Sequence, residues 1–173
     1  MRAHRSAVFA LVAFTLGASP LAAQDVRTTE VTPYLALGSA GASPVGTAVT
    51  FPVTSALSVE TDVAYRRGEG GLHALSSSVS LLYFLPRAGR STPYVVGGVG
   101  LAQYGAPVFS LSGPPIGTDA RLALTVNAGG GLRTPINEKL DLRTDARWFK
   151  SFGRYGSEQF RVAQGLSFDV GKR

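Results

Sequence analysis

The chain has no cysteine and only two histidines, and each shortage excludes a class of function. Without cysteine it can form no disulfide scaffold, no Cys-ligated zinc site and no thiol nucleophile. With one of the two histidines at position 4, we predict no metal site, and we expect no cofactor. No run of about 18 apolar residues occurs, which excludes a membrane-spanning helix. A closed β-barrel is then the remaining way for the chain to cross a bilayer.

The N-terminal segment has the features of an export signal. Arg2 and Arg5 open the chain, an apolar stretch covers residues 7–16, and small residues follow. A basic start, a short apolar core and a small-residue exit are typical of a secretory signal peptide. We therefore expect residues 1–23 to be a cleaved signal peptide and residues 24–173 to form one domain. The alternative interpretation of the first segment is a buried N-terminal helix.

After this segment, apolar and polar residues alternate with a period of two. The clearest cases are Leu57–Arg66 and Leu140–Phe149, where one set of alternate positions is mostly apolar and the other is rich in charge. Successive side chains of a strand point to opposite faces, so this pattern predicts strands with one apolar and one polar face. Eight such segments are predicted, at residues 29–38, 46–53, 57–67, 72–84, 92–104, 121–133, 139–149 and 158–170.

The connections between these segments are rich in Gly, Pro and Ser, as turns require. We expect the longest connection, Gly105–Ala120, at one end of the molecule (the loop end), and the tighter connections at 54–56, 85–91 and 134–138 at the other (the turn end). An even number of strands joined in this way predicts an all-β fold. Specifically, it predicts an eight-stranded antiparallel up-and-down β-barrel.

A weak internal repeat accompanies the strands. Thr32-Pro33-Tyr34 recurs as Thr92-Pro93-Tyr94, in the first and fifth predicted strands. Leu57–Asp62 resembles Leu140–Asp145, in the third and seventh. The spacing indicates a four-strand unit used twice.

Alternation alone does not say which face lies inside, and the charges favour a polar interior. Ions in a narrow interior must be paired, because an unpaired buried ion costs several kcal/mol. Placing the polar face inward collects equal numbers of acidic and basic residues. We predict an inward ion-pair lattice of Glu30, Glu60, Asp62, Asp141, Asp145, Asp169, Arg66, Arg121, Arg133, Arg143, Arg147 and Arg161.

Aromatic residues on the apolar face favour the same arrangement, because they gather near the strand ends. Two aromatic girdles around an aliphatic band are expected where a barrel meets the two lipid interfaces. The predicted girdles consist of Tyr65, Trp148 and Phe160 at the loop end and of Phe51, Tyr83 and Phe168 at the turn end. Together with the export signal, these features predict a transmembrane β-barrel with its apolar face toward lipid.

Four stretches resemble the small eight-stranded outer-membrane β-barrels of Gram-negative bacteria, the family of the OmpA barrel domain and OmpX. They are Thr92–Leu101 (TPYVVGGVGL), Ala128–Arg133 (AGGGLR), Leu140–Trp148 (LDLRTDARW) and Gly165–Phe168 (GLSF). The resemblance implies a monomer in the cell outer membrane that contacts lipid and lipopolysaccharide and is inserted by the outer-membrane assembly machinery. One departure is that family members usually end on an aromatic residue, whereas this chain continues past Phe168 to Arg173.

Other patterns could indicate more specific functions, but each also has a structural explanation. The glycine clusters at 97–100 and 129–131 precede no predicted helix, so we expect close backbone contacts there and no phosphate-binding loop. His73 and Ser76 suggest a hydrolase, because some barrels of this size modify lipid A. On an unbroken strand, however, the two side chains face opposite sides. The apolar residues of the long connection either bind a partner or pack over the barrel mouth.

Basic residues allow two further interpretations. Arg67, Lys150 and Arg154 at the loop end could bind lipopolysaccharide phosphates or simply be solvated. The high isoelectric point suggests nucleic acid, but the inward arginines are matched by acids, so we expect no nucleic-acid partner.

We predict a non-enzymatic outer-membrane β-barrel with a structural or surface-binding role. Its inward lattice either plugs the lumen or forms a polar path with slight pore activity. One alternative is a soluble exported β-barrel that binds a small apolar ligand, as lipocalins do, which requires the aliphatic face inside. The other is a lipid A-modifying barrel enzyme that depends on His73.

Overall fold

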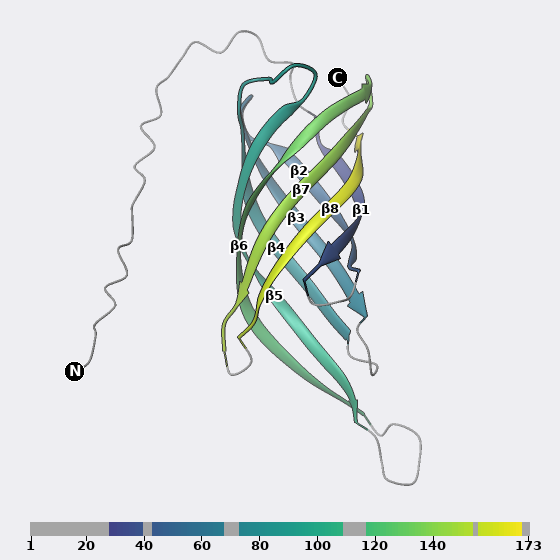
Figure 1. Cartoon of the computed structure of the whole chain (residues 1–173), viewed down its shortest axis with the longest axis vertical. Coiled ribbons are helices and arrows are strands. Elements are labelled where there is room, and N and C mark those ends of the chain that lie inside the picture. Colours follow the sequence, from purple (N-terminus) through teal and green to yellow (C-terminus); the bar gives the residue numbers. More distant parts are fainter. Residues whose placement is uncertain (1–27, 40–42, 68–72, 109–116, 154–155, 171–173) are drawn as a thin grey trace, which may run out of the picture.

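The computed structural model is a closed barrel of eight antiparallel strands, and it describes residues 28–39, 43–67, 73–108, 117–153 and 156–170. Each strand pairs with its neighbours in the sequence, and the last pairs with the first (Figure 1). The strands are β1 (Glu30–Gly38), β2 (Val45–Pro52), β3 (Leu57–Arg67), β4 (His73–Phe84), β5 (Thr92–Val108), β6 (Gly117–Asn137), β7 (Leu140–Ser151) and β8 (Glu158–Asp169). The fold predicted from the alternation is therefore confirmed.

The expected signal peptide, residues 1–23, lies outside the described residues. In the part of the chain that is described, no helix has the length and hydropathy needed to span a bilayer.

The two faces of the strands lie as the charge pattern predicts. Leu35 and Leu37 of β1 point outward and are 69% and 72% exposed, whereas Glu60 of β3 and Arg147 of β7 point inward and are 0% and 1% exposed. This arrangement contradicts the soluble-barrel alternative, which requires the aliphatic side chains inside. The interior is mixed, because apolar and aromatic side chains fill the space that the polar groups leave. One apolar cluster consists of alanines around Tyr34, and the other of Leu82, Phe84, Tyr94 and Val96.

The residue range predicted for the loop between the fifth and sixth strands, Gly105–Ala120, is wrong because it is too long. β5 and β6 continue as a paired ladder from Tyr104↔Arg121 to Val108↔Gly117, so only residues 109–116 lie outside the described strands. Figure 1 shows this hairpin extending past the rest of the barrel. Pro107 suggested a loop, but β4 begins at His73 opposite Gly105. Beyond that point, β5 pairs only with β6 among the described residues, as an edge strand does, and proline is tolerated there.

The other end of β6 also extends beyond the prediction. The strand runs to Asn137 with an irregularity between Pro135 and Asn137, and the turn to β7 consists of Glu138 and Lys139. The backbone NH of Lys139 donates to the Asn137 side chain at 2.9 Å, which fixes this turn. The turn predicted at 134–138 is therefore shorter than expected.

Candidate functional site

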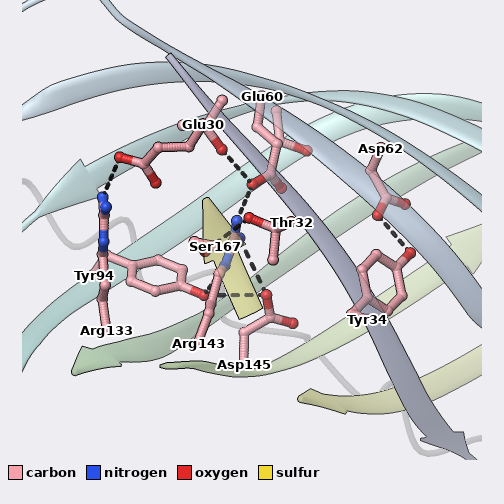
Figure 2. A network of polar contacts seen from close by, with 12 residues as sticks. Glu30, Thr32, Tyr34, Glu60, Asp62, Tyr94, Arg133, Arg143, Asp145 and Ser167 are labelled. Atoms are coloured by element: carbon pink, nitrogen blue, oxygen red, sulfur yellow. Dashed lines mark hydrogen bonds and ion pairs between the residues drawn. The ribbon is translucent and has the colours of Figure 1, made fainter. Parts of the chain in front are cut away.

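The barrel interior gathers most of the predicted lattice, and its centre is a cluster from β3, β5 and β7 (Figure 2). Arg147 Nη2 lies 2.7 Å from Glu60 Oε1 and 3.0 Å from Asp145 Oδ2. Arg143 pairs with Glu60 through Nη1 and with Asp145 through Nη2, the latter at 3.2 Å. Tyr94 donates to Asp145 Oδ2 at 3.0 Å and accepts from Arg143 Nε at 2.8 Å. We call these five residues the central cluster.

A second group lies closer to the loop end. Tyr34 of β1 donates to Asp62 Oδ2 at 2.5 Å and accepts from Arg161 Nη1 at 2.9 Å. The Arg161 guanidinium also stacks on two rings, with its carbon 5.0 Å from the Tyr34 centroid and 4.7 Å from the Phe149 centroid. A guanidinium between aromatic faces gains cation–π attraction in addition to its charge pair.

The internal repeat of the sequence reappears in these two groups. Tyr34 of the first Thr-Pro-Tyr bonds Asp62 at the end of the first Leu-x-x-x-Thr-Asp. Tyr94 of the second bonds Asp145 at the end of the second. In each pair an arginine donates to the tyrosine hydroxyl. The four-strand unit is thus repeated in its contacts as well as in its sequence.

Each of these tyrosines lies over a glycine of the following strand. A Cβ added at Gly46 or Gly131 would clash with the ring of Tyr34 or of Tyr94, at 2.5 Å from Cζ in both cases. The glycines of β2 and β6 therefore make room for large inward side chains, as expected for the glycine clusters.

A third group closes the turn end. Arg133 of β6 lies 2.5 Å from Glu30 of β1 and also pairs with Asp141 of β7. Asp169, which the sequence also placed in the lattice, is half-buried and forms no ion pair with any described residue. Nearby, the hydroxyls of Ser91 and Thr134 lie 2.7 Å apart.

The loop end of the interior has a different character, because neutral side chains replace the ion pairs. Arg66 of β3 donates to Gln159 Oε1 at 2.8 Å and has no acidic partner among the described residues. The hydroxyls of Tyr104 and Ser151 lie 2.9 Å apart. A cavity of about 60 Å³ lies among these groups. Arg121 reaches this level in register, but its side chain is outside the described part of the structure.

Sequence reasoning missed Tyr34 and Gln159, although their parity placed both inward. Tyr34 shares a face with Glu30 and lies in the repeat, so the repeat itself was the signal that could have identified it. Gln159 carries no such signal, because its contact with Arg66 joins strands that are far apart in the sequence.

The predicted girdle residues all project from the outer face. Trp148 and Phe160 lie directly opposite each other on β7 and β8, close to the loop end. Exposed outer-face side chains of the girdles are Phe51, Tyr65, Trp148, Phe160 and Phe168, and Tyr83 is half-buried. Aliphatic side chains of the outer face, among them Val63, Val79, Val99 and Leu124, lie between these two groups along the strands.

The basic residues predicted at the loop end differ in their surroundings. Lys150 donates to Glu158 at 2.9 Å, and this contact lowers the pKa of the Glu158 carboxyl. Arg67 is exposed, and Arg154 lies outside the described residues. Among the described side chains, no group of three or more His, Asp or Glu is arranged to hold a metal ion.

His73 and Ser76 lie on opposite faces of β4, as their parity predicts. The imidazole of His73 lies over the outer face of Gly105, where an added Cβ would come within 2.6 Å of Cε1. The Ser76 hydroxyl points to the interior and donates to the Ala64 carbonyl at 3.4 Å.

No protein-family model and no curated protein sequence matches the chain. Solved structures do match its fold. The N-terminal β-barrel domain of Pseudomonas aeruginosa OprF is 16% identical, with a TM-score of 0.62, over 83% of this chain and 97% of that one. Neisserial surface protein A is 12% identical, with a TM-score of 0.63, over 83% and 95%. The outer membrane enzyme PagL is 16% identical, with a TM-score of 0.51, over 82% and 99%. The chain therefore has the fold of the small eight-stranded outer-membrane β-barrels.

Proposed function

We propose that the protein is a non-enzymatic, monomeric outer-membrane barrel with a structural or surface-binding role and a lumen closed by its ion pairs. The observation that carries this proposal is the inverted distribution of polarity, with aliphatic side chains outside and paired charges inside. In water, such an exterior would be one continuous apolar surface, far larger than the patches that soluble monomers expose. In a bilayer, the same surface is solvated by lipid chains, and barrel closure satisfies the backbone groups.

The contacts of the interior support a closed lumen. The central cluster joins β3, β5 and β7, and the group around Arg161 adds β1 and β8 at the adjacent level. Eight strands enclose a space just wide enough for side chains. The cavity that borders both groups measures only about 10 Å³. We therefore expect no steady ion conductance, and slight pore activity would require the central cluster to break.

A catalytic role receives no support from the positions of the two candidate residues. The reaction of a serine hydrolase needs its histidine within hydrogen-bond reach of the nucleophile. His73 faces outward with Arg67 and Gly105 as its cross-strand neighbours, and neither is a nucleophile. Ser77, on the same face of β4, is four residues away, or roughly 13 Å along the strand. The similarity to the enzyme PagL concerns the fold, and fold does not determine function.

The ends of the barrel suggest an orientation for this proposal. Both ends of the described chain lie at the turn end, where Val170 N donates to Thr29 O at 2.9 Å. With short turns toward the periplasm and longer loops toward the outside, as in bacterial outer-membrane barrels, the loop end faces the exterior. Arg67 would then lie at the level of lipopolysaccharide phosphates, and residues 1–23 would direct export before insertion by the outer-membrane assembly machinery.

The test is the mobility of detergent-refolded protein on an SDS gel, with and without boiling, followed by planar-bilayer recording. We expect a heat-dependent shift, because a closed barrel resists unheated SDS, and no steady conductance. Solubility in plain buffer without a gel shift would contradict the membrane barrel. A gel shift with steady conductance would retain the barrel but contradict the closed lumen.

A further inference from the structure

The loop end of the interior holds polar groups that the closed-lumen account does not use. We call the cavity of about 60 Å³ at this end the vestibule. Its polar lining includes Arg66, Ser76, Ser78, Tyr104, Gln159 and Arg161. A cavity needs roughly 10–15 Å³ to hold one water molecule, so the vestibule has room for about four to six water molecules. An oxyanion with five heavy atoms has a comparable size.

Hydrogen-bond donors in the vestibule outnumber their acceptors. Ser78 is one of the residues that line the cavity, and its buried hydroxyl has no hydrogen-bond partner among the described residues. Arg161 is also buried and borders the cavity. Its hydrogen bonds within the described structure use Nη1, and its buried Nε has no hydrogen-bond partner there. A buried donor without a partner is energetically unfavourable, and an acceptor bound nearby would relieve that cost.

The charge of the vestibule also favours a ligand that accepts hydrogen bonds, because the lining is net positive. Asp62 is the acidic residue among its lining groups, and it is already engaged by Tyr34 and Arg161. Arg66 adds a second guanidinium, which donates to the neutral side chain of Gln159. The described lining groups therefore carry one more positive than negative charge, at the end of the barrel that is not closed by the central cluster.

We propose that the vestibule binds a small oxyanion of the size of inorganic phosphate. Guanidinium groups bind phosphate oxygens through paired N–H donors, and hydroxyls supply further bonds. Arg66 is half-buried at the mouth, so it can meet a ligand that enters from the loop end. The proposal concerns the binding chemistry alone. It relies on the proposed membrane orientation only for the compartment from which the anion comes.

The test is a phosphate titration of isotope-labelled mature protein in a maltoside detergent, which contains no phosphate, at constant ionic strength. We expect saturable shifts of the Ser76, Ser78 and Gln159 amides. Arg66→Gln should weaken binding by at least about tenfold, because it removes a charged donor. The matched control is Arg67→Gln, the adjacent residue of β3, whose side chain points outward and is exposed. This variant should bind phosphate as the wild type does.

Three results would overturn the proposal. The first is the lack of a saturable shift in the wild type. The second is equal weakening by Arg66→Gln and Arg67→Gln, which would indicate general surface attraction. The third is the same shifts with chloride, which would indicate a simple counterion. An SDS gel with and without boiling shows whether Arg66→Gln folds. If it does not, Arg66→Lys, which keeps the charge and loses the planar fork, replaces it and should bind more weakly than wild type.

Discussion

At the scale of single residues, Asp145 connects most of the central cluster. Its Oδ2 accepts hydrogen bonds from Tyr94, Arg143 and Arg147, and the residue is buried. Removing one member of a buried ion pair leaves an uncompensated charge and costs about 3–5 kcal/mol. Asp145 and Glu60 together balance the charges of Arg143 and Arg147. Without Asp145, Glu60 would be the one carboxylate left for both guanidinium groups.

Asp145→Ala should therefore lower the free energy of unfolding by about 3–5 kcal/mol. Urea unfolding of the refolded barrel in detergent measures this change. The control is Glu158→Gln, because Glu158 is exposed and pairs only with Lys150 among the described residues. Its urea midpoint should match that of the wild type. An unchanged midpoint for Asp145→Ala would show that the inward assignment of this face is wrong.

Gly131 tests the packing of tyrosine over glycine. A Cβ at this position would lie 2.5 Å from Tyr94 Cζ and 2.5 Å from the backbone oxygen of Thr144, which cannot move aside without disturbing β7. Gly131→Ala should cost about 1–3 kcal/mol, as overpacking usually does. Gly97→Ala is the matched control, since its Cβ would approach only Asn127 O, at 3.8 Å. Equal urea midpoints for the two variants would contradict this packing.

At the scale of elements, the β5–β6 hairpin divides into a part that closes the barrel and a part that does not. Up to Gly105, β5 pairs with β4 as well as β6. Beyond that residue, the described ladder from Ala106↔Asp119 to Val108↔Gly117 pairs only with itself. Within the described structure, the extension therefore contributes no strand pair to the closure of the barrel.

Replacing residues 107–118 with an Asn-Gly turn should leave the barrel folded. Asn-Gly suits a two-residue hairpin connection. The expected result is a heat-dependent gel shift like that of the full chain and a similar urea midpoint. Loss of the gel shift would show that the extension is needed for folding, contrary to its pairing.

The existence of all eight strands could be predicted from the sequence, because the alternation of apolar and polar residues is a local property. The ends of β5 and β6 could not, since Pro107 is acceptable only where β5 has become an edge strand. That condition depends on where β4 begins, which no local pattern shows. The girdle residues were found because parity alone places them outside.

The partners within the lattice were harder to predict. Parity places Arg143, Arg147 and Glu60 inside the barrel, but it does not show that these side chains meet there. Their contacts join β7 to β3 across the lumen and depend on the register of a closed barrel. The sequence therefore predicts that inward charges are paired without specifying the pairs. Arg66 shows the limit of that rule, because among the described residues it donates to an amide oxygen and not to a carboxylate.

For the whole molecule, the proposed function requires that lipid surround the outer face of the barrel. The chain contains a single tryptophan, Trp148, which lies on that face in the girdle of the loop end. Its fluorescence therefore reports on one known position without any substitution. An amphipathic ring at this level should lie at the boundary between headgroups and acyl chains.

The most direct measurement is the fluorescence of Trp148 in protein folded into vesicles of brominated phosphatidylcholine. We expect blue-shifted emission that is quenched more strongly by bromine near the headgroup than by bromine near the bilayer centre. We also expect weak quenching by iodide added to the water. Red-shifted emission that iodide quenches and brominated lipid does not would contradict the account, because the apolar face would then not face lipid.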